Sequence, residues 1–142
     1  MARCIFCQIA SGDVAVDLIY HDELIAAFLD NHPIRPGHTM IVSREHFPYF
    51  EDLPEATANR ILHVGQRLAS AMKELYKVPR VAFAFTGGDH PHAHAHVIPM
   101  HEKTDLTSRR YILEENLTFR STPQASPDEL AETTAQLRRT LG

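Results

Sequence analysis

The sequence lacks several features that would place the protein in a specialised class. No stretch is long and apolar enough to cross a bilayer, and residues 1–4 lack the apolar run of a secretory signal. The net charge is −4, so nothing favours general binding to nucleic acid or to a membrane surface. Neither a repeat nor a low-complexity segment interrupts the chain. We therefore expect one cytoplasmic domain over residues 1–142, because this length suits a single core.

Cysteine is also scarce, since the chain has only Cys4 and Cys7. A disulfide that closed so small a loop would stabilise little, and a reducing cytosol would keep it open. In such a compartment Cys-x-x-Cys indicates either a redox pair or half of a zinc site. A redox pair is expected after a strand in a βαβ unit, whereas this pair starts the chain, so we favour zinc.

Apolar periodicity predicts an α+β domain with a mainly antiparallel sheet. β-prone runs cover residues 16–20, 25–30, 39–43 and 81–85, and the first two are typical of a hairpin. A short helical or irregular segment over residues 5–10 precedes them. Residues 111–119 carry no clear pattern.

Two helices are predicted. Asp52, Pro54 and Glu55 resemble a capping box before a long helix that ends ahead of Pro79. The apolar stripe of this helix comprises Ile61, Leu62, Val64, Leu68, Ala69, Met72 and Leu75. Ser126 and Glu129 form a second capping signal, which introduces a terminal helix over residues 130–141.

Three histidines alternate with small residues at His92, His94 and His96. Side chains on a strand point alternately to opposite faces, so these imidazoles are predicted to share one face. Ala93, Ala95 and Val97 would then pack in the interior. Three histidines at strict alternation, directly after a Gly-Gly turn, argue against a merely exposed polar face.

Two chemical hypotheses follow from this histidine strand. Alternate strand histidines can bind a catalytic zinc ion, which leaves a water position open. Alternatively, a neutral imidazole can attack phosphorus and form a phosphoramidate intermediate. The second hypothesis also uses the preceding turn, because the backbone N–H groups of Thr86, Gly87 and Gly88 could bind an anion.

The segment His92–Ile98 resembles the His-x-His-x-His signature of the histidine triad (HIT) family. Three other segments are similar to family motifs in the same order: Cys4–Ile9, Ala27–Asp30 with Pro33, and Pro36–Val42. The resemblance implies a HIT-like fold with a core over residues 4–101 and a C-terminal extension, residues 102–142, that contains the terminal helix. It also implies a hydrolase or transferase that acts at the α-phosphate of nucleotide conjugates.

The resemblance carries specific roles to residues of this sequence. His94 would be the nucleophile that carries a transient nucleotidyl group, and His96 would orient the phosphate and support the leaving group. His38 would hydrogen-bond the nucleophile, and Asp30 would accept hydrogen bonds from ribose hydroxyls. The remaining nucleotide-binding residues would be Phe6, Ile9, Phe28, Leu29, Thr86, Gly87, Gly88 and Asp89. The loop that holds the last four is shorter than in many members, and we expect the next residue, His90, to be solvated.

The resemblance also selects the zinc ligands. His46 and His92 are the candidates to join Cys4 and Cys7, because family members with a Cys-x-x-Cys start have a histidine at the position of His46. In those members the first triad histidine completes the site. Four protein ligands would make the zinc structural rather than catalytic.

Two functions remain open at this point. The first is a homodimeric enzyme that binds purine nucleotides and acts on phosphoramidates, dinucleoside polyphosphates or other adenylated compounds. The alternative is a nucleotide-binding sensor or interaction protein with weak or vestigial activity. The sequence specifies neither the leaving group nor the role of the C-terminal segment.

Overall fold

A computed structural model describes residues 4–88, 90–106, 116 and 121–142. Asp89 and nearly all of the unassigned stretch 111–119 lie outside these described residues. The elements in chain order are α1 (Ile5–Ser11), β1 (Leu18–His21), β2 (Ile25–Leu29), β3 (Thr39–Ser43), the 3-10 helix η1 (Phe50–Asp52), α2 (Glu55–Tyr76), β4 (Arg80–Ala84), β5 (His94–Met100) and α3 (Pro127–Leu141). No helix in the described ranges has the length and hydropathy needed to cross a membrane.

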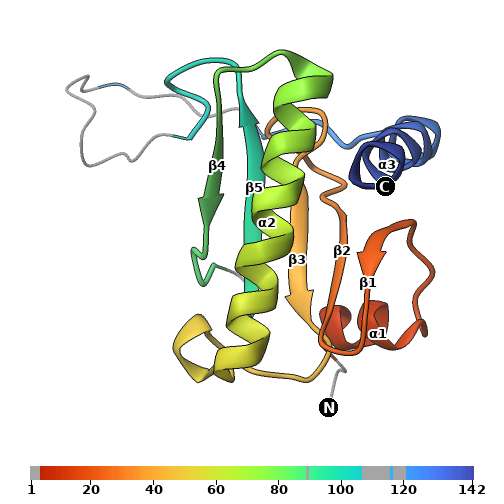
Figure 1. Cartoon of the computed structure of the whole chain (residues 1–142), viewed down its shortest axis with the longest axis vertical. Coiled ribbons are helices and arrows are strands. Elements are labelled where there is room, and N and C mark those ends of the chain that lie inside the picture. Colours follow the sequence, from red (N-terminus) through yellow and green to blue (C-terminus); the bar gives the residue numbers. More distant parts are fainter. Residues whose placement is uncertain (1–3, 89, 107–115, 117–120) are drawn as a thin grey trace.

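The five strands form one antiparallel sheet in the order β1-β2-β3-β5-β4, which confirms the expected α+β class (Figure 1). The predicted strand over residues 39–43 is confirmed at both ends. The predicted hairpin pairs β1 with β2, and Asp22 closes it by accepting hydrogen bonds from the backbone N–H groups of Leu24 and Ile25. The first strand begins at Leu18 rather than at residue 16, where Val16 is exposed.

The long helix α2 covers one face of the sheet (Figure 1). Its buried residues Ile61, Val64, Leu68 and Met72 pack in a core with residues of β2, β3 and β5. The predicted stripe was wrong at Leu62, which is 50% exposed. The reason is that each helical residue turns about 100° from the last, so Leu62 leaves the face that Ile61 occupies.

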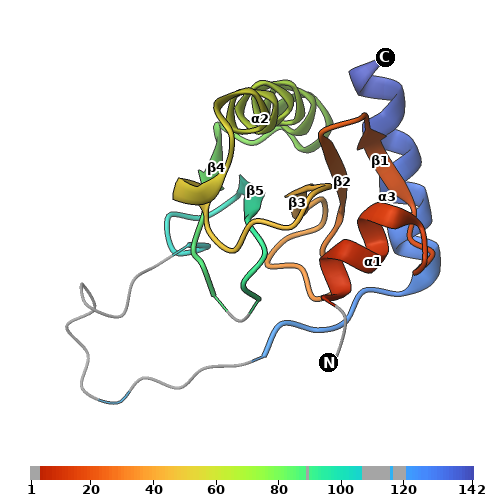
Figure 2. The same ribbon diagram turned by 90° about the horizontal axis from the view of Figure 1, so that it is seen from below.

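The opposite face of the sheet carries the short helix α1 (Figure 2). Phe6 and Ile9 of α1 pack against Ala26, Phe28 and Val42. Strand alternation separates this second cluster from the first, since Ala27 and Ile41 point to the α2 side. Figure 2 also shows α3 beside β1, where the sheet ends.

Of the two predicted caps, one is confirmed. The Ser126 hydroxyl accepts a hydrogen bond from the Glu129 N–H, and the Glu129 carboxylate accepts one from the Ser126 N–H. The helix therefore starts at Pro127, three residues earlier than predicted. The cap at Asp52 was wrong, because that residue ends η1 and its carboxylate accepts from the Tyr49 N–H instead.

Candidate functional site

The three alternating histidines lie on the side of the sheet that α1 covers. His94 and His96 stand opposite Val42 and Met40 of β3, and their ring centroids lie 5.1 Å apart. Ala95 and Val97 point into the core on the α2 side, as predicted. His92 precedes β5, which starts at His94, but its ring also faces α1, 5.8 Å from that of Phe6. The backbone bends before β5, and the N–H of Ala93 donates to the carbonyl of Phe47.

The loop between β2 and β3 brings a fourth histidine, His38, beside the strand. Gly37 precedes it with φ +95°, and a Cβ there would lie 2.6 Å from the Tyr76 ring, so only glycine fits this approach. Arg35 of the same loop bonds Asp105 at 2.7 Å, which lowers the pKa of that carboxyl to about 2 and ties the loop to the turn after β5. The position of His38 is therefore fixed from two sides.

Hydrogen bonds determine which nitrogen of each ring carries the proton. The Ile34 N–H donates to His38 Nδ1 at 3.1 Å, so the proton of neutral His38 lies on Nε2. This Nε2 lies 2.9 Å from His96 Nδ1, which must accept. His96 therefore carries its own proton on Nε2.

His94 has the opposite tautomer. Its Nδ1 lies 2.7 Å from the carbonyl oxygen of His92, which can only accept, so Nδ1 donates. The Nε2 lone pair of His94 is left available for a ligand. The predicted hydrogen bond between His38 and the nucleophile His94 was wrong. His38 instead hydrogen-bonds His96, and a backbone carbonyl orients His94.

Burial favours the neutral form of His38 and His96. His38 is 3% exposed, and desolvation lowers its pKa from 6.5 to about 4, against the opposing charge of Asp30, whose Oδ2 lies 3.7 Å away. Desolvation also lowers the pKa of His96, with a smaller contribution from His94. These two neutral rings can each donate and accept a hydrogen bond near neutral pH.

A separate cluster forms where α1 meets the start of β5. We call Cys4, Cys7, His46 and His92 the cysteine–histidine cluster, since one ligand atom of each lies within 4.8 Å of the others. The Cys4 and Cys7 Sγ atoms lie 3.4 and 3.5 Å from His92 Nδ1, and Cys7 Sγ lies 3.3 Å from His46 Nδ1. The two Nδ1 atoms are 3.2 Å apart.

These distances fit a tetrahedral zinc ion. Zn–S and Zn–N bonds of about 2.3 and 2.05 Å at a tetrahedral angle require S–N separations of about 3.6 Å and an N–N separation of about 3.3 Å. The buried His92 ring is also prepared for this role, because its Nε2 lies 2.7 Å from the carbonyl oxygen of Ser43. That bond places the proton on Nε2 and leaves the Nδ1 lone pair facing the cluster.

Ligand atoms of Asp30, His38 and His96 also lie within 4.8 Å of one another, but the ring protons of the two histidines occupy positions that metal binding would require to be free. A metal at this point would need lone pairs on His38 Nε2 and His96 Nδ1. The Ile34 N–H already occupies the lone pair of His38 Nδ1, so Nε2 must keep its proton. His38 and His96 therefore form a hydrogen-bonded pair with the Asp30 carboxylate 3.7 Å from His38 Nε2, which argues against a metal ion at this point.

A pocket of about 760 Å³ opens in front of His94 and His96. It gathers nine of the predicted site residues: Phe6, Ile9, Phe28, Leu29, Asp30, Thr86, Gly88, His94 and His96. The structure places Gly87 in a neighbouring pocket of about 300 Å³ that His94 also lines. His38 stands behind His96 rather than in the pocket, and Asp89 lies outside the described residues.

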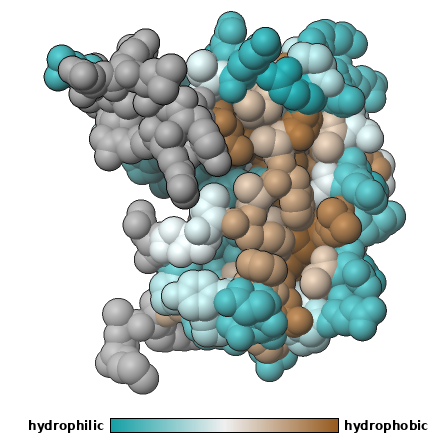
Figure 3. Space-filling model, turned by 90° about the vertical axis from the view of Figure 1, so that its left-hand side faces the viewer, coloured by the Kyte–Doolittle hydropathy of each residue, from teal (hydrophilic) through white to brown (hydrophobic). Residues whose placement is uncertain are grey.

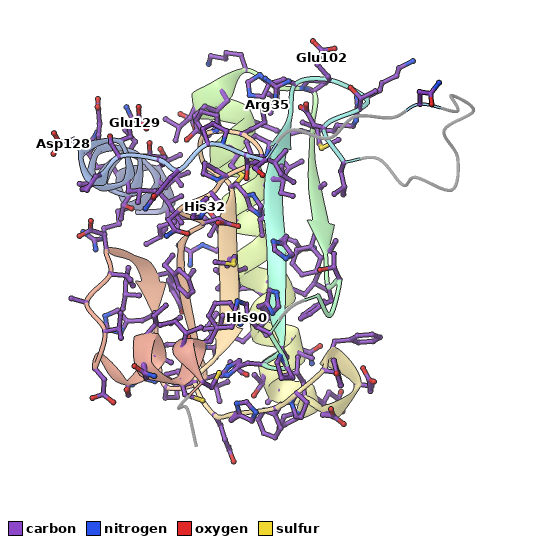
Figure 4. All side chains as sticks on the ribbon, turned by 180° about the vertical axis from the view of Figure 1, so that it is seen from behind. His32, Arg35, His90, Glu102, Asp128 and Glu129 are labelled. Atoms are coloured by element: carbon purple, nitrogen blue, oxygen red, sulfur yellow. The ribbon has the colours of Figure 1, made fainter. Side chains whose placement is uncertain are left out.

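The pocket also contains residues that sequence reasoning missed. His90 is exposed, as expected of a solvated residue, yet it lines the pocket with its ring 5.2 Å from that of Phe6. His32 lines it as well, and Figure 4 shows both histidines on the sheet face opposite α2. Leu130 and Thr134 reach the pocket from α3, although their helical spacing signalled only packing.

Comparison with known proteins agrees with this geometry. The model of the HIT domain family matches residues 12–103. The chain belongs to the HIT domain family. A HIT-like protein of Methanocaldococcus jannaschii is 30% identical over 70% of this chain and 80% of its own length. An adenosine 5'-monophosphoramidase of Schizosaccharomyces pombe is 32% identical over 68% of this chain and 73% of its own.

Among solved HIT structures, a zinc-bound histidine triad family protein of Mycobacterium smegmatis is similar over the whole fold. Its TM-score is 0.72 at 30% identity, with 97% of this chain and 92% of that chain covered. At the level of the family, these similarities support a nucleotide hydrolase. The zinc-bound relative and the cysteine–histidine cluster point to zinc binding.

Proposed function

We propose that this HIT protein cleaves nucleotide conjugates at the α-phosphate through a nucleotidyl-His94 intermediate. The observation that carries the proposal is the pair of opposite tautomers in one pocket. His94 presents an Nε2 lone pair, and its neighbour His96 presents an Nε2–H donor. A nucleophile beside a proton donor is the pairing that such a displacement needs.

The reaction balances with these two residues and water. The His94 Nε2 lone pair forms a bond to phosphorus while the bond from phosphorus to the leaving group breaks. The leaving group takes the Nε2 proton of His96, which leaves that ring an imidazolate that accepts a hydrogen bond at Nδ1 from the His38 Nε2–H. The ring of His94, which gains a bond at Nε2 and keeps its Nδ1 proton, carries the balancing positive charge. Water then attacks phosphorus, the P–N bond to His94 breaks, and the water proton returns to His96 Nε2.

The pocket favours a nucleoside monophosphate with a weakly charged leaving group. The apolar side chains of Phe6, Ile9 and Phe28 suit the faces of a base. Asp30 accepts a backbone hydrogen bond at Oδ1, and its other carboxylate oxygen accepts none from the backbone of the described residues, so it can bind ribose hydroxyls. Among the described residues that line the pocket, none is lysine or arginine. A phosphoramidate therefore fits better than a polyphosphate, in line with the activity named for the fission yeast relative.

Trapping of the intermediate tests this proposal. The protein is mixed rapidly with adenosine 5'-monophosphoramidate labelled in the adenosine and quenched in alkali, where a phosphohistidine bond survives. The wild-type protein should carry labelled nucleotide, whereas His94→Ala should bind nucleotide without labelling. His63→Ala, an exposed histidine of α2, is the matched control and should label normally.

Two results would count against this mechanism. Normal turnover by His94→Ala would refute the nucleophile. Tight nucleotide binding by the wild-type protein without any labelling or turnover would instead favour the nucleotide sensor.

We further propose that the cysteine–histidine cluster binds a structural zinc ion. The support comes from its tetrahedral spacing and from the Ser43 carbonyl, which orients His92. Such a site connects α1 to the start of β5 and leaves no open position for water. Two thiolate ligands persist best in a reducing compartment, which supports a cytoplasmic location.

A homodimer completes the proposal. β4 ends the sheet, and within the described chain its outer edge pairs with no strand. Figure 3 faces this side of the molecule, where apolar side chains form a strip. Leu62, Phe83 and Phe50 are 50%, 38% and 60% exposed, which is typical of a surface that a second copy covers. Sedimentation should therefore give the mass of two chains, and Phe83→Glu should give the mass of one.

A further inference from the structure

The C-terminal helix α3 contributes to the pocket in front of His94. Pro127, Leu130 and Thr134 line this pocket together with residues of α1 and β2. The match to the HIT family model ends at residue 103, so membership of the family assigns no role to α3. The pocket therefore contains residues both of the expected core, residues 4–101, and of the expected C-terminal extension, residues 102–142.

Backbone hydrogen bonds fix how the chain enters α3. The N–H of Ala125 donates to the carbonyl of Asn31 at 2.8 Å, and the Thr122 hydroxyl donates to the carbonyl of His32 at 2.9 Å. Both acceptors lie on the loop that follows Asp30, and both line the pocket. The capping box at Ser126 then starts the helix. The end of the pocket is thus attached to the loop that carries Asp30; Figure 4 shows His32 close to the first turn of α3.

Thr134 is a polar residue of this wall, and its hydroxyl has no hydrogen-bond partner among the described residues. The residue is 1% exposed, and the described chain offers its Oγ1 no hydrogen bond. A threonine hydroxyl inside a helix usually donates to the carbonyl four residues earlier, as Thr140 of the same helix does to Gln136 at 3.0 Å. A buried hydroxyl without a partner costs free energy, which a bound ligand can recover.

The other residues that line this pocket define the chemistry of that ligand. Leu130, Ile9 and Val14 offer apolar walls, and the histidines lie at the reacting end. A ligand that places its phosphate at His94 and extends to α3 needs flat apolar faces and a polar edge. A purine base has both features, whereas a pyrimidine is shorter by one ring.

We propose that α3 forms the end wall of the base-binding part of the pocket and that the Thr134 hydroxyl hydrogen-bonds the polar edge of a purine. This inference rests on the proposed function, since it assumes that a nucleotide occupies the pocket. The contact would make Thr134 a determinant of base selectivity. Because the Oγ1 atom is buried, the side chains in front of it must shift slightly when the base binds.

Binding measurements on Thr134→Val test the inference. Valine keeps the shape of threonine and removes only the hydroxyl, so the melting temperature should stay the same or rise. Calorimetric titration with AMP and GMP should show about tenfold weaker binding of the purine nucleotide that the wild-type protein prefers. The preference between the two should fall, and affinity for UMP should not change. Thr134→Ser should restore purine binding.

Thr140→Val is the matched control, because it removes a threonine hydroxyl from α3 away from the pocket. Equal affinities for Thr134→Val and wild type would overturn the inference, as would an equal loss for AMP, GMP and UMP. Failure of the wild-type protein to bind any nucleotide would overturn the proposed function and this inference together. Changed selectivity with retained melting temperature has no explanation in a purely structural role.

Discussion

Acidification should destabilise the fold through His38, and the loss can be calculated from the structure. Burial holds the pKa of this histidine at about 4 in the folded protein, against 6.5 as its ordinary value. Between these two values the unfolded chain binds more protons than the folded chain, so the free energy of unfolding falls as the pH falls. The contribution from His38 is about 2 kcal/mol at pH 5 relative to pH 8.

Urea denaturation of the wild-type protein and His38→Asn at several pH values measures this term. Asparagine does not titrate, and its side-chain oxygen can accept the hydrogen bond that the Ile34 N–H now gives to Nδ1. Other titrating groups, including the cysteine–histidine cluster, are common to both proteins and cancel in the difference. The gap in unfolding free energy between the two proteins should therefore change by about 2 kcal/mol from pH 8 to pH 5. Parallel pH curves would show that buried neutral His38 does not control acid stability.

Two further predictions concern zinc removal near the N-terminus and the cap of the C-terminal helix α3. Metal analysis of protein purified without added zinc should find about one zinc per chain. A strong chelator should lower the melting temperature. A protein that contains no zinc and whose melting temperature is unchanged by the chelator would contradict the zinc proposal. Ser126→Ala should lower the free energy of unfolding by about 1 kcal/mol, because it removes the side-chain acceptor of the α3 cap. Thr140→Ala, at the other end of the same helix, provides the comparison for that measurement.

Local patterns predicted much of the fold because their physical causes are local. A compact run of β-branched and apolar residues identified β3 at both ends, and the Ser126–Glu129 pair identified the start of α3 to within a few residues. Prediction failed where the local backbone geometry favoured an arrangement other than the one that the pattern indicated. Asp52 has the right neighbours for a cap, yet its carboxylate accepts from Tyr49 once the chain folds into η1. Leu62 belongs to an apolar run, but the rotation of the helix exposes it.

The sequence by itself determined the chemical parts of the candidate site. Residue types and spacing single out the triad histidines and the Cys-x-x-Cys pair, and the resemblance to the HIT family singles out Asp30. Only the tertiary structure decided which nitrogen of each ring is free, because that depends on carbonyls and N–H groups brought together from other segments. The His92 carbonyl orients His94, the Ile34 N–H orients His38, and the Ser43 carbonyl turns His92 toward the cysteines. The contribution of α3 to the pocket is likewise a property of packing, because Thr134 follows His94 by forty positions in the chain and meets the pocket only after α3 docks beside β1.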